Sequence, residues 1–145
     1  MSTEHHRKLE RMYLHAPVNA FYSPTIEIAQ GRAIIEIVVR EAFFHAAGAI
    51  HGSIYFKVLD DAAYFAVNSI VDDTFVLTAS FNLHIFRPVS AGVLRAEGKL
   101  LSGASRHYVG ESVATVDGVE VARGTGTFLK SRRVLGEIPE YEQAQ

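Results

Sequence analysis

The stretch HGSIYFKVLDDAAYFAVNSI, residues 51–70, decides the fold of this chain. From Ser53 to Ile70, apolar side chains fall on nearly every face of a helix. The strongly polar residues within it are Lys57, Asp60, Asp61 and Asn68. A surface helix keeps one polar face, whereas a helix that is apolar all round is buried. The sequence therefore predicts a long helix, at about Ser53 to Ile70, that other structure encloses.

Strand patterns flank this helix on both sides. Before it, Thr25–Ala29 and Arg32–Val39 are rich in Ile and Val and are separated by a Gln-Gly turn. After it, residues 75–85 alternate strictly between apolar and polar side chains, so the face from Phe75 to Ile85 is expected to pack on the helix. Further strands are predicted at Gly92–Ser102, Ser105–Val116 and Val119–Lys130, the last two joined by Asp117-Gly118.

A short helix at Glu4–His15, stopped by Pro17, is predicted before the first strand. The element order is then α-β-β-α-β-β-β-β, and the predicted fold class is α+β, a curved antiparallel sheet wrapped around the long helix. We expect a single domain over residues 1–145, with residues 1–15 as an N-terminal helix and residues 136–145 as a peripheral tail.

Composition excludes several classes of function. The chain is 48% hydrophobic and 21% charged, as in an ordinary globular protein, and its net charge of −2 argues against nucleic acid as a partner. With no cysteine, it has no disulfide, thiolate metal site or cysteine nucleophile. It also lacks a bilayer-length apolar run and a signal-peptide pattern near Met1, so no membrane partner and a cytoplasmic location are expected.

Two adjacent acids stand on the predicted enclosed helix. Burying an unpaired carboxylate costs several kcal/mol, so each acid requires a partner, a proton or a ligand. Lys57 precedes Asp61 by one helical turn and is expected to pair with it, whereas Asp60 points about 100° away around the helix. Asp61 thus has a structural explanation, and Asp60 is the candidate for chemistry.

The start of the same helix is a candidate site for a developing oxyanion. Helix N-termini carry unpaired amides and a partial positive charge, and Gly52 lets a ligand approach the backbone closely. Asp60 lies eight residues further on, roughly 12 Å along the axis. One helix cannot bring both groups to one carbonyl, so the sequence predicts a dimer in which two helices lie side by side.

The chain resembles the phenylacetyl-CoA-type (PaaI-like) hot-dog thioesterases. The likeness is carried by HGSIYFKVLDDAAYFAVNS (residues 51–69), SFNLHIFRPVSAG (80–92) and VDGVEVARGTGTF (116–128). It implies a hot-dog fold and hydrolysis of an acyl-CoA substrate without a cofactor, by a homodimer or homotetramer. It also implies that Asp60 is the nucleophile or general base, that the Gly52 amide binds the thioester oxygen, and that Thr78 supports Asp60.

The resemblance extends to other residues near the two motifs. The second glycine of the family's His-Gly-Gly motif is Ser53 here, which could cap the helix through its hydroxyl. His45 occupies the position where relatives often place an Asn, and His51 and Asp61 complete the residues expected near the substrate. For the phosphates of CoA, the resemblance implies cations near strand ends, and the candidates are Arg87, Arg106, His107, Lys130, Arg132 and Arg133.

Other interpretations stay open. Asp60 could be a structural carboxylate satisfied by the backbone or Lys57, His51 could only anchor the preceding loop, and Thr78 could be an ordinary strand residue. A hot-dog dehydratase or hydratase would use a His and an acid for proton transfer at carbon, and a binding module would hold acyl-CoA without turnover. Metal binding is not expected, because the histidines lack zinc-type spacing. The helix aromatics, Tyr55, Phe56, Tyr64 and Phe65, are expected in the core.

Overall fold

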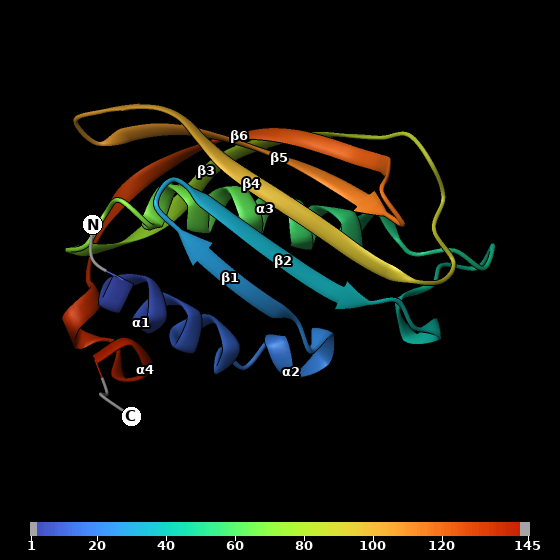
Figure 1. Cartoon of the computed structure of the whole chain (residues 1–145), viewed down its shortest axis with the longest axis horizontal. Coiled ribbons are helices and arrows are strands. Elements are labelled where there is room, and N and C mark those ends of the chain that lie inside the picture. The colour runs from blue at the N-terminus through green and yellow to red at the C-terminus, as the bar shows by residue number, and fades with distance from the viewer. Residues whose placement is uncertain (1–2, 143–145) are drawn as a thin grey trace.

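The computed structural model describes residues 3–142 and contains one six-stranded antiparallel sheet that curves around a central helix (Figure 1). The sheet order is β1-β2-β4-β5-β6-β3. The strands are β1 (Thr25–Ala29), β2 (Arg32–Val38), β3 (Thr74–Ile85), β4 (Val93–Ala104), β5 (His107–Val116) and β6 (Val119–Val134). The central helix is α3 (Gly52–Asn68). The predicted α+β class and hot-dog fold are therefore confirmed.

Shorter helices lie at both ends of the chain. They are α1 (Thr3–Leu14), α2 (Asn19–Tyr22) and α4 (Pro139–Glu142), with single 3₁₀ turns at Glu41–Phe43 and Leu135–Glu137. The sequence pattern predicted α1 but neither α2 nor α4. The predicted tail at residues 136–145 includes α4, whose buried Tyr141 accepts or donates a 2.8 Å hydrogen bond with His5 of α1. Residues 143–145 of that tail lie outside the described part of the chain.

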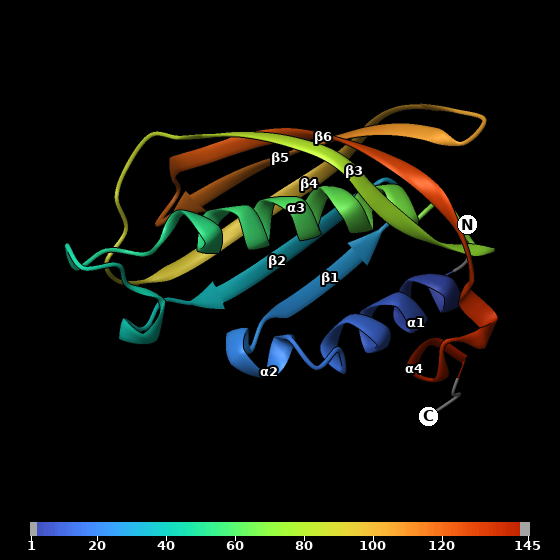
Figure 2. The same cartoon turned by 180° about the vertical axis from the view of Figure 1, so that it is seen from behind.

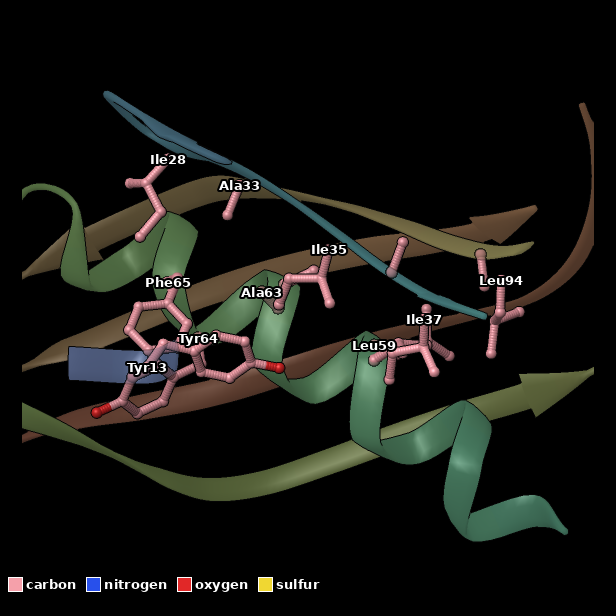
Figure 3. Close-up of a cluster of buried hydrophobic side chains, with 14 of the residues drawn as sticks. Tyr13, Ile28, Ala33, Ile35, Ile37, Leu59, Ala63, Tyr64, Phe65 and Leu94 are labelled. Atoms are coloured by element: carbon pink, nitrogen blue, oxygen red, sulfur yellow. The ribbon is translucent and has the colours of Figure 1, made fainter. Parts of the chain in front are cut away.

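Close approach of α3 to the concave face of the sheet explains why the helix is apolar all round. A β-carbon at Gly98 of β4 would lie 2.1 Å from the Ala62 carbonyl oxygen, so only glycine permits this contact. Ser112 of β5 donates a 2.7 Å hydrogen bond to the carbonyl of Leu59. On the opposite side, α1 contributes Tyr13 to a cluster with Phe65 and Tyr64, which Figure 3 shows together. None of the helices within residues 3–142 has the length and apolar character needed to cross a membrane.

The strict alternation predicted for residues 75–85 is wrong at its centre. The register between β3 and β6 shifts between Thr78 and Ser80, and again between Thr74 and Val76. Val76 is consequently fully buried, while Leu77, predicted to face the helix, is 50% exposed. A bulge inserts an unpaired residue and moves the side chains beyond it to the other face. Thr78 and Phe81, which strict alternation assigned to opposite faces, therefore both face α3.

Candidate active site

The loop-to-helix corner at residues 51–53 is held by a histidine cap. His51 is the N-cap of α3, and its ring Nδ1 accepts a 3.0 Å hydrogen bond from the Ser53 amide. The Ser53 hydroxyl lies 2.9 Å from the same nitrogen. Ser53 does not cap the helix, as the sequence suggested it could, because it is the second helical residue and His51 occupies the N-cap position. Gly52 is the first helical residue, and its own amide forms no hydrogen bond within residues 3–142.

Asp61 is paired with Lys57, as their helical spacing predicted. The Lys57 Nζ lies 2.8 Å from Asp61 Oδ2, and the Tyr13 hydroxyl donates a 2.7 Å hydrogen bond to the same oxygen. Burial raises the pKa of Asp61 against the opposing effect of Lys57 and Tyr13. Burial and the neighbouring Asp61 carboxylate also raise the pKa of the Tyr13 hydroxyl, so it remains protonated as the donor. The N-terminal arm, residues 3–22 with helices α1 and α2, thus supplies one partner of this acid.

Asp60 has one hydrogen-bond partner among the described residues and lacks a cation of its own. The Thr78 hydroxyl donates a 2.9 Å hydrogen bond to Asp60 Oδ1. Burial raises the pKa of Asp60 to about 6, the Thr78 hydrogen bond opposes that shift, and the charge on Asp61 adds to it. The carboxylate is therefore ionised near neutral pH but weakly stabilised, which is the state expected of a general base.

A cavity of about 310 Å³ adjoins both acids. One wall consists of Lys57, Asp60, Asp61, Tyr64 and Phe65 from α3 and of residues 75–78 from β3. The other wall comes from the N-terminal arm and comprises Met12, Tyr13, Ala16, Val18 and Asn19. In Figure 2 this arm lies alongside β1, on the side of β1 away from α3 in that view. The lining is mainly apolar and aromatic, so the cavity suits a neutral organic group beside the Asp60 carboxylate.

A second cavity, of about 290 Å³, lies at the N-terminal end of α3. Its lining includes Gly52, His45 and Arg87, together with Ala49, Ile50, Tyr55, Ile85, Phe86 and Pro88. His45 is exposed, and its ring Nδ1 accepts a 3.0 Å hydrogen bond from the Ala47 amide. This second cavity shares no lining residue with the cavity beside Asp60. Within one chain, Asp60 and Gly52 therefore line different cavities, as expected from their separation of roughly 12 Å along the helix axis.

The candidate CoA ligands do not gather at one place in the chain. Arg87 lines the cavity at Gly52. Arg106 and His107 lie at the β4–β5 hairpin, where Arg106 donates to the carbonyl of Lys130. The Lys130 ammonium in turn pairs with Asp73 at 3.0 Å. The two remaining candidates, Arg132 and Arg133, are exposed on β6.

The structure adds site residues that sequence patterns missed. Tyr13, Asn19 and Phe75 line the cavity beside Asp60, and none of them belonged to the predicted site. Their positions depend on how the arm folds back over α3, which no local periodicity reveals. Of the four aromatics of α3 expected in the core, Tyr55, Tyr64 and Phe65 are buried and Phe56 is 39% exposed. No group of three or more metal-binding side chains occurs within residues 3–142.

Comparisons with known proteins agree with this architecture. Residues 47–118 match the family model described as "Thioesterase superfamily". An inferred esterase of Saccharolobus solfataricus is 28% identical over 104 residues, covering 71% of this chain and 74% of the relative. The match to this family model supports thioester hydrolysis as the general class of activity.

Solved structures extend the likeness to nearly the whole chain. The Escherichia coli PaaI protein, from the phenylacetic acid degradation operon, superposes with a TM-score of 0.83 at 17% identity, covering 92% of this chain and 97% of that one. A thioesterase family protein from Silicibacter pomeroyi gives a TM-score of 0.78 at 23% identity, covering 86% and 96%. At these identities the likeness establishes the fold. The chain therefore has a PaaI-like hot-dog fold, and its residues 47–118 are similar to the thioesterase superfamily.

Proposed function

We propose that this chain hydrolyses acyl-CoA thioesters to a free carboxylic acid and CoA, with Asp60 as the reacting carboxylate. The observation that carries the proposal is the contrast between two neighbouring acids on one helix. Asp61 is occupied by Lys57 and Tyr13, whereas Asp60 faces a cavity with only the Thr78 hydroxyl as partner. A partly desolvated carboxylate beside an apolar cavity is suited to activate water or to attack a carbonyl.

The Gly52 amide is the proposed donor to the thioester oxygen. It is the first amide of a 17-residue helix and is unpaired within residues 3–142, so it adds to the positive end of the helix dipole. A β-carbon at this position would meet nothing closer than Ile85 Cδ1 at 3.7 Å. Packing within the chain therefore does not demand glycine at residue 52, and the open backbone is available to a ligand.

A two-fold dimer through the free edge of β3 would complete the site. β3 ends the sheet, so its outer edge has backbone groups open to pairing with a second copy. Apolar side chains near this edge and on the open face of α3 are exposed: Phe56, Leu77, Ile85 and Phe86. Antiparallel α3 helices would then set Asp60 beside Gly52 of the partner subunit, and Arg87 of the partner subunit beside the departing CoA. Assembly into a tetramer would join such dimers through other surfaces.

Two chemical routes use the same groups. In one, Asp60 takes a proton from water as the water oxygen attacks the thioester carbon. In the other, the Asp60 carboxylate attacks that carbon and forms an anhydride, which water then hydrolyses. In both, the carbonyl oxygen gains negative charge near the Gly52 amide, the C–S bond breaks, and the CoA sulfur leaves as a thiolate that takes up a proton. Thr78 keeps the Asp60 carboxylate oriented.

The first experiment measures thiol release from aryl-, short- and medium-chain acyl-CoAs by the wild type, Asp60→Asn and Asp61→Asn. Loss of a general base lowers turnover by about 10²–10⁴-fold. We expect that loss for Asp60→Asn in a folded protein, and a much smaller one for Asp61→Asn, its matched neighbour. Equal activity of Asp60→Asn and the wild type would remove Asp60 from the mechanism. Tight acyl-CoA binding without thiol release by the wild type would favour a binding module instead.

A second experiment tests whether two subunits share each site. Gly52→Pro removes the proposed donor amide at the first helical position, where proline is tolerated, and His51 already has the extended conformation (φ −64°, ψ 149°) that precedes proline. Asp60→Asn and Gly52→Pro should each be inactive alone. Random mixing by unfolding and refolding together should restore about a quarter of wild-type activity, because each mixed dimer holds one intact site. No recovery, with mixed dimers present, would place the whole site within one subunit.

A further inference from the structure

The strand β1 ends the sheet on the side opposite β3, and helix α1 lies along its outer edge (Figure 1). Two side chains of α1 hydrogen-bond to the backbone of one β1 residue, Ile28. The Arg7 guanidinium donates a 2.7 Å hydrogen bond to the Ile28 carbonyl, and Glu10 Oε2 accepts a 2.7 Å hydrogen bond from the Ile28 amide. Arg7 and Glu10 also pair with each other at 2.6 Å. An ion pair of α1 therefore satisfies both backbone groups of Ile28.

These two groups are the ones that β1 directs away from its neighbour β2. In an antiparallel pair, alternate residues exchange both backbone hydrogen bonds with the partner strand, and the residues between them direct theirs outward. The two-residue turn makes Ala29 and Arg32 the first bonded pair, so Ile28 directs its amide and carbonyl to the free edge. Arg7 and Glu10 thus supply the donor and the acceptor that a further strand would supply.

The sequence of β1 contains no other protection against edge pairing. Natural sheets protect exposed edges with proline, lysine, bulges or a covering segment. β1 reads TIEIA, without lysine or proline, and its register with β2 has no shift. The other edge strand, β3, has two register shifts. The helix that covers β1 is therefore what protects this edge.

A second copy of this chain fits the covered edge. If two β1 strands met antiparallel about a two-fold axis with Ile28 opposite Ile28, each Ile28 amide would donate to the other's carbonyl. Glu27 would then lie opposite Ala29 of the other copy, so like charges would not face each other. We propose that α1 is an edge cap: Arg7 and Glu10 take the place of a second copy's Ile28, and release of the helix lets β1 pair with β1 of another copy.

The proposal is independent of the chemistry at Asp60, because Arg7, Glu10 and Ile28 do not line the cavity beside that residue. In the double variant Arg7→Ala with Glu10→Ala, both outward groups of Ile28 lose their partners. Pairing with another copy restores those hydrogen bonds, so the variant gains a reason to self-associate. Light scattering should then give a larger mass than that of the wild type, rising with protein concentration.

The register of the association is tested with cysteines, since the chain has none of its own. Glu27→Cys and Ala29→Cys are made separately in the Arg7→Ala, Glu10→Ala background, mixed in equal amounts and oxidised. A pairing centred on Ile28 brings residue 27 of one copy opposite residue 29 of the other, within reach of a disulfide. Two copies of the same cysteine variant are offset by two residues, at roughly 7–8 Å, which is too far. We expect several-fold more cross-linked dimer in the mixture than in either variant alone.

The matched control is Arg11→Ala on the same helix. Arg11 donates to the carbonyls of Glu140 and Tyr141 in α4, so its loss loosens α1 and leaves both bonds to Ile28 in place. This control should keep the wild-type mass, and the cysteines should not cross-link when Arg7 and Glu10 are restored.

Three results would overturn the proposal. They are a double variant with the wild-type mass, equal cross-linking in every combination of cysteines, and assembly of Arg11→Ala to the same extent as the double variant. The last would show that general loosening of the arm, rather than the bonds to Ile28, controls association. If the double variant does not fold, Glu10→Ala alone repeats the test, because it keeps the hydrogen bond from Arg7.

Discussion

The two sides of α3 that carry Asp60 and Asp61 differ more than their adjacent positions suggest. Asp61 faces the N-terminal arm and is held by Lys57 and by the Tyr13 hydroxyl. Asp60 faces the bulged strand β3 and is held by Thr78 alone, with a pKa raised to about 6. Burial raises the pKa of both carboxylates, but a rotation of about 100° around one helix gives Asp61 a cation and a hydroxyl as partners and leaves Asp60 with the Thr78 hydroxyl alone.

This difference is the basis for proposing Asp60, and not Asp61, as the reacting carboxylate. The Asp61 carboxylate is paired with the Lys57 ammonium. The negative charge of Asp61 also helps to raise the pKa of Asp60. The Thr78 hydroxyl opposes that shift and fixes the orientation of Asp60. The contacts of Asp61 are thus expected to govern the stability of the protein, and the contacts of Asp60 to govern its activity. The predictions below test this division.

The largest expected effect on stability is at Lys57. Lys57→Met removes the cation from a largely buried pair and leaves Asp61 uncompensated, which should lower the free energy of unfolding by about 2–4 kcal/mol. Urea unfolding at a fixed protein concentration measures the change. The double variant Lys57→Met with Asp61→Leu should lose less than the single variant, because no isolated charge remains. A loss no larger than about 0.5 kcal/mol for the single variant would contradict the structural role of the pair.

Asp60→Asn should stabilise the protein at the same time as it abolishes activity. The pKa of Asp60 is raised from 3.8 to about 6 in the folded state, so the native protein binds the proton more tightly than the unfolded chain. Stability contributed by this group is therefore lost as the pH rises between those values, and the loss persists above them. The variant should be more stable than the wild type by about 1–3 kcal/mol at pH 8 and nearly equal at pH 4. If the variant were less stable than the wild type at pH 8, the predicted direction of the stability change would be wrong.

The pH dependence of turnover should follow the carboxylate of Asp60. Because the ionised form is required, kcat/KM should fall about ten-fold per pH unit below about 6 and level off above it. Asp61→Asn removes the negative charge that raises the pKa of Asp60, so its inflection should move to lower pH. An unchanged inflection in Asp61→Asn would show that the two carboxylates are not coupled.

The smallest expected effect is that of the hydroxyl on β3. Thr78→Val keeps the side-chain shape but removes the hydrogen bond that lowers the pKa of Asp60, so the inflection should move to higher pH. The lost hydrogen bond to a charged group corresponds to roughly 1–2 kcal/mol, or about ten-fold in kcat/KM near pH 6. Thr78→Ser keeps the hydroxyl and should retain most of the activity. Equal profiles for Thr78→Val and the wild type would reduce Thr78 to a packing residue.

Much of the architecture could be predicted from local patterns. The long helix was expected at Ser53 to Ile70 and runs from Gly52 to Asn68, because a segment apolar on all faces has to be enclosed. The turns Gln30-Gly31 and Asp117-Gly118 correctly marked two hairpins, since Gly31, Asp117 and Gly118 have positive φ angles. The Lys57–Asp61 pair followed from helical spacing alone.

The face of each side chain on β3 could not be predicted in the same way. Alternation assigns faces only while every residue pairs with one on the neighbouring strand, and β3 and β6 lose that register near Ala79. The resemblance to known thioesterases nominated Thr78 as the partner of Asp60, and the register shift explains how that residue reaches the helix. The catalytic roles of Asp60, Gly52 and Thr78 stay predictions until turnover is measured.

The sequence by itself determined which segments form the sheet, which helix the sheet encloses, and which acid on that helix pairs with Lys57, because all three follow from spacing along the chain. Only the tertiary structure decided how the N-terminal arm forms one wall of the cavity beside Asp60. The site depends on contacts between residues far apart in sequence, such as Tyr13 with Asp61 and Asp60 with Thr78. Local propensity carries no information about such contacts, since packing of the whole chain creates them.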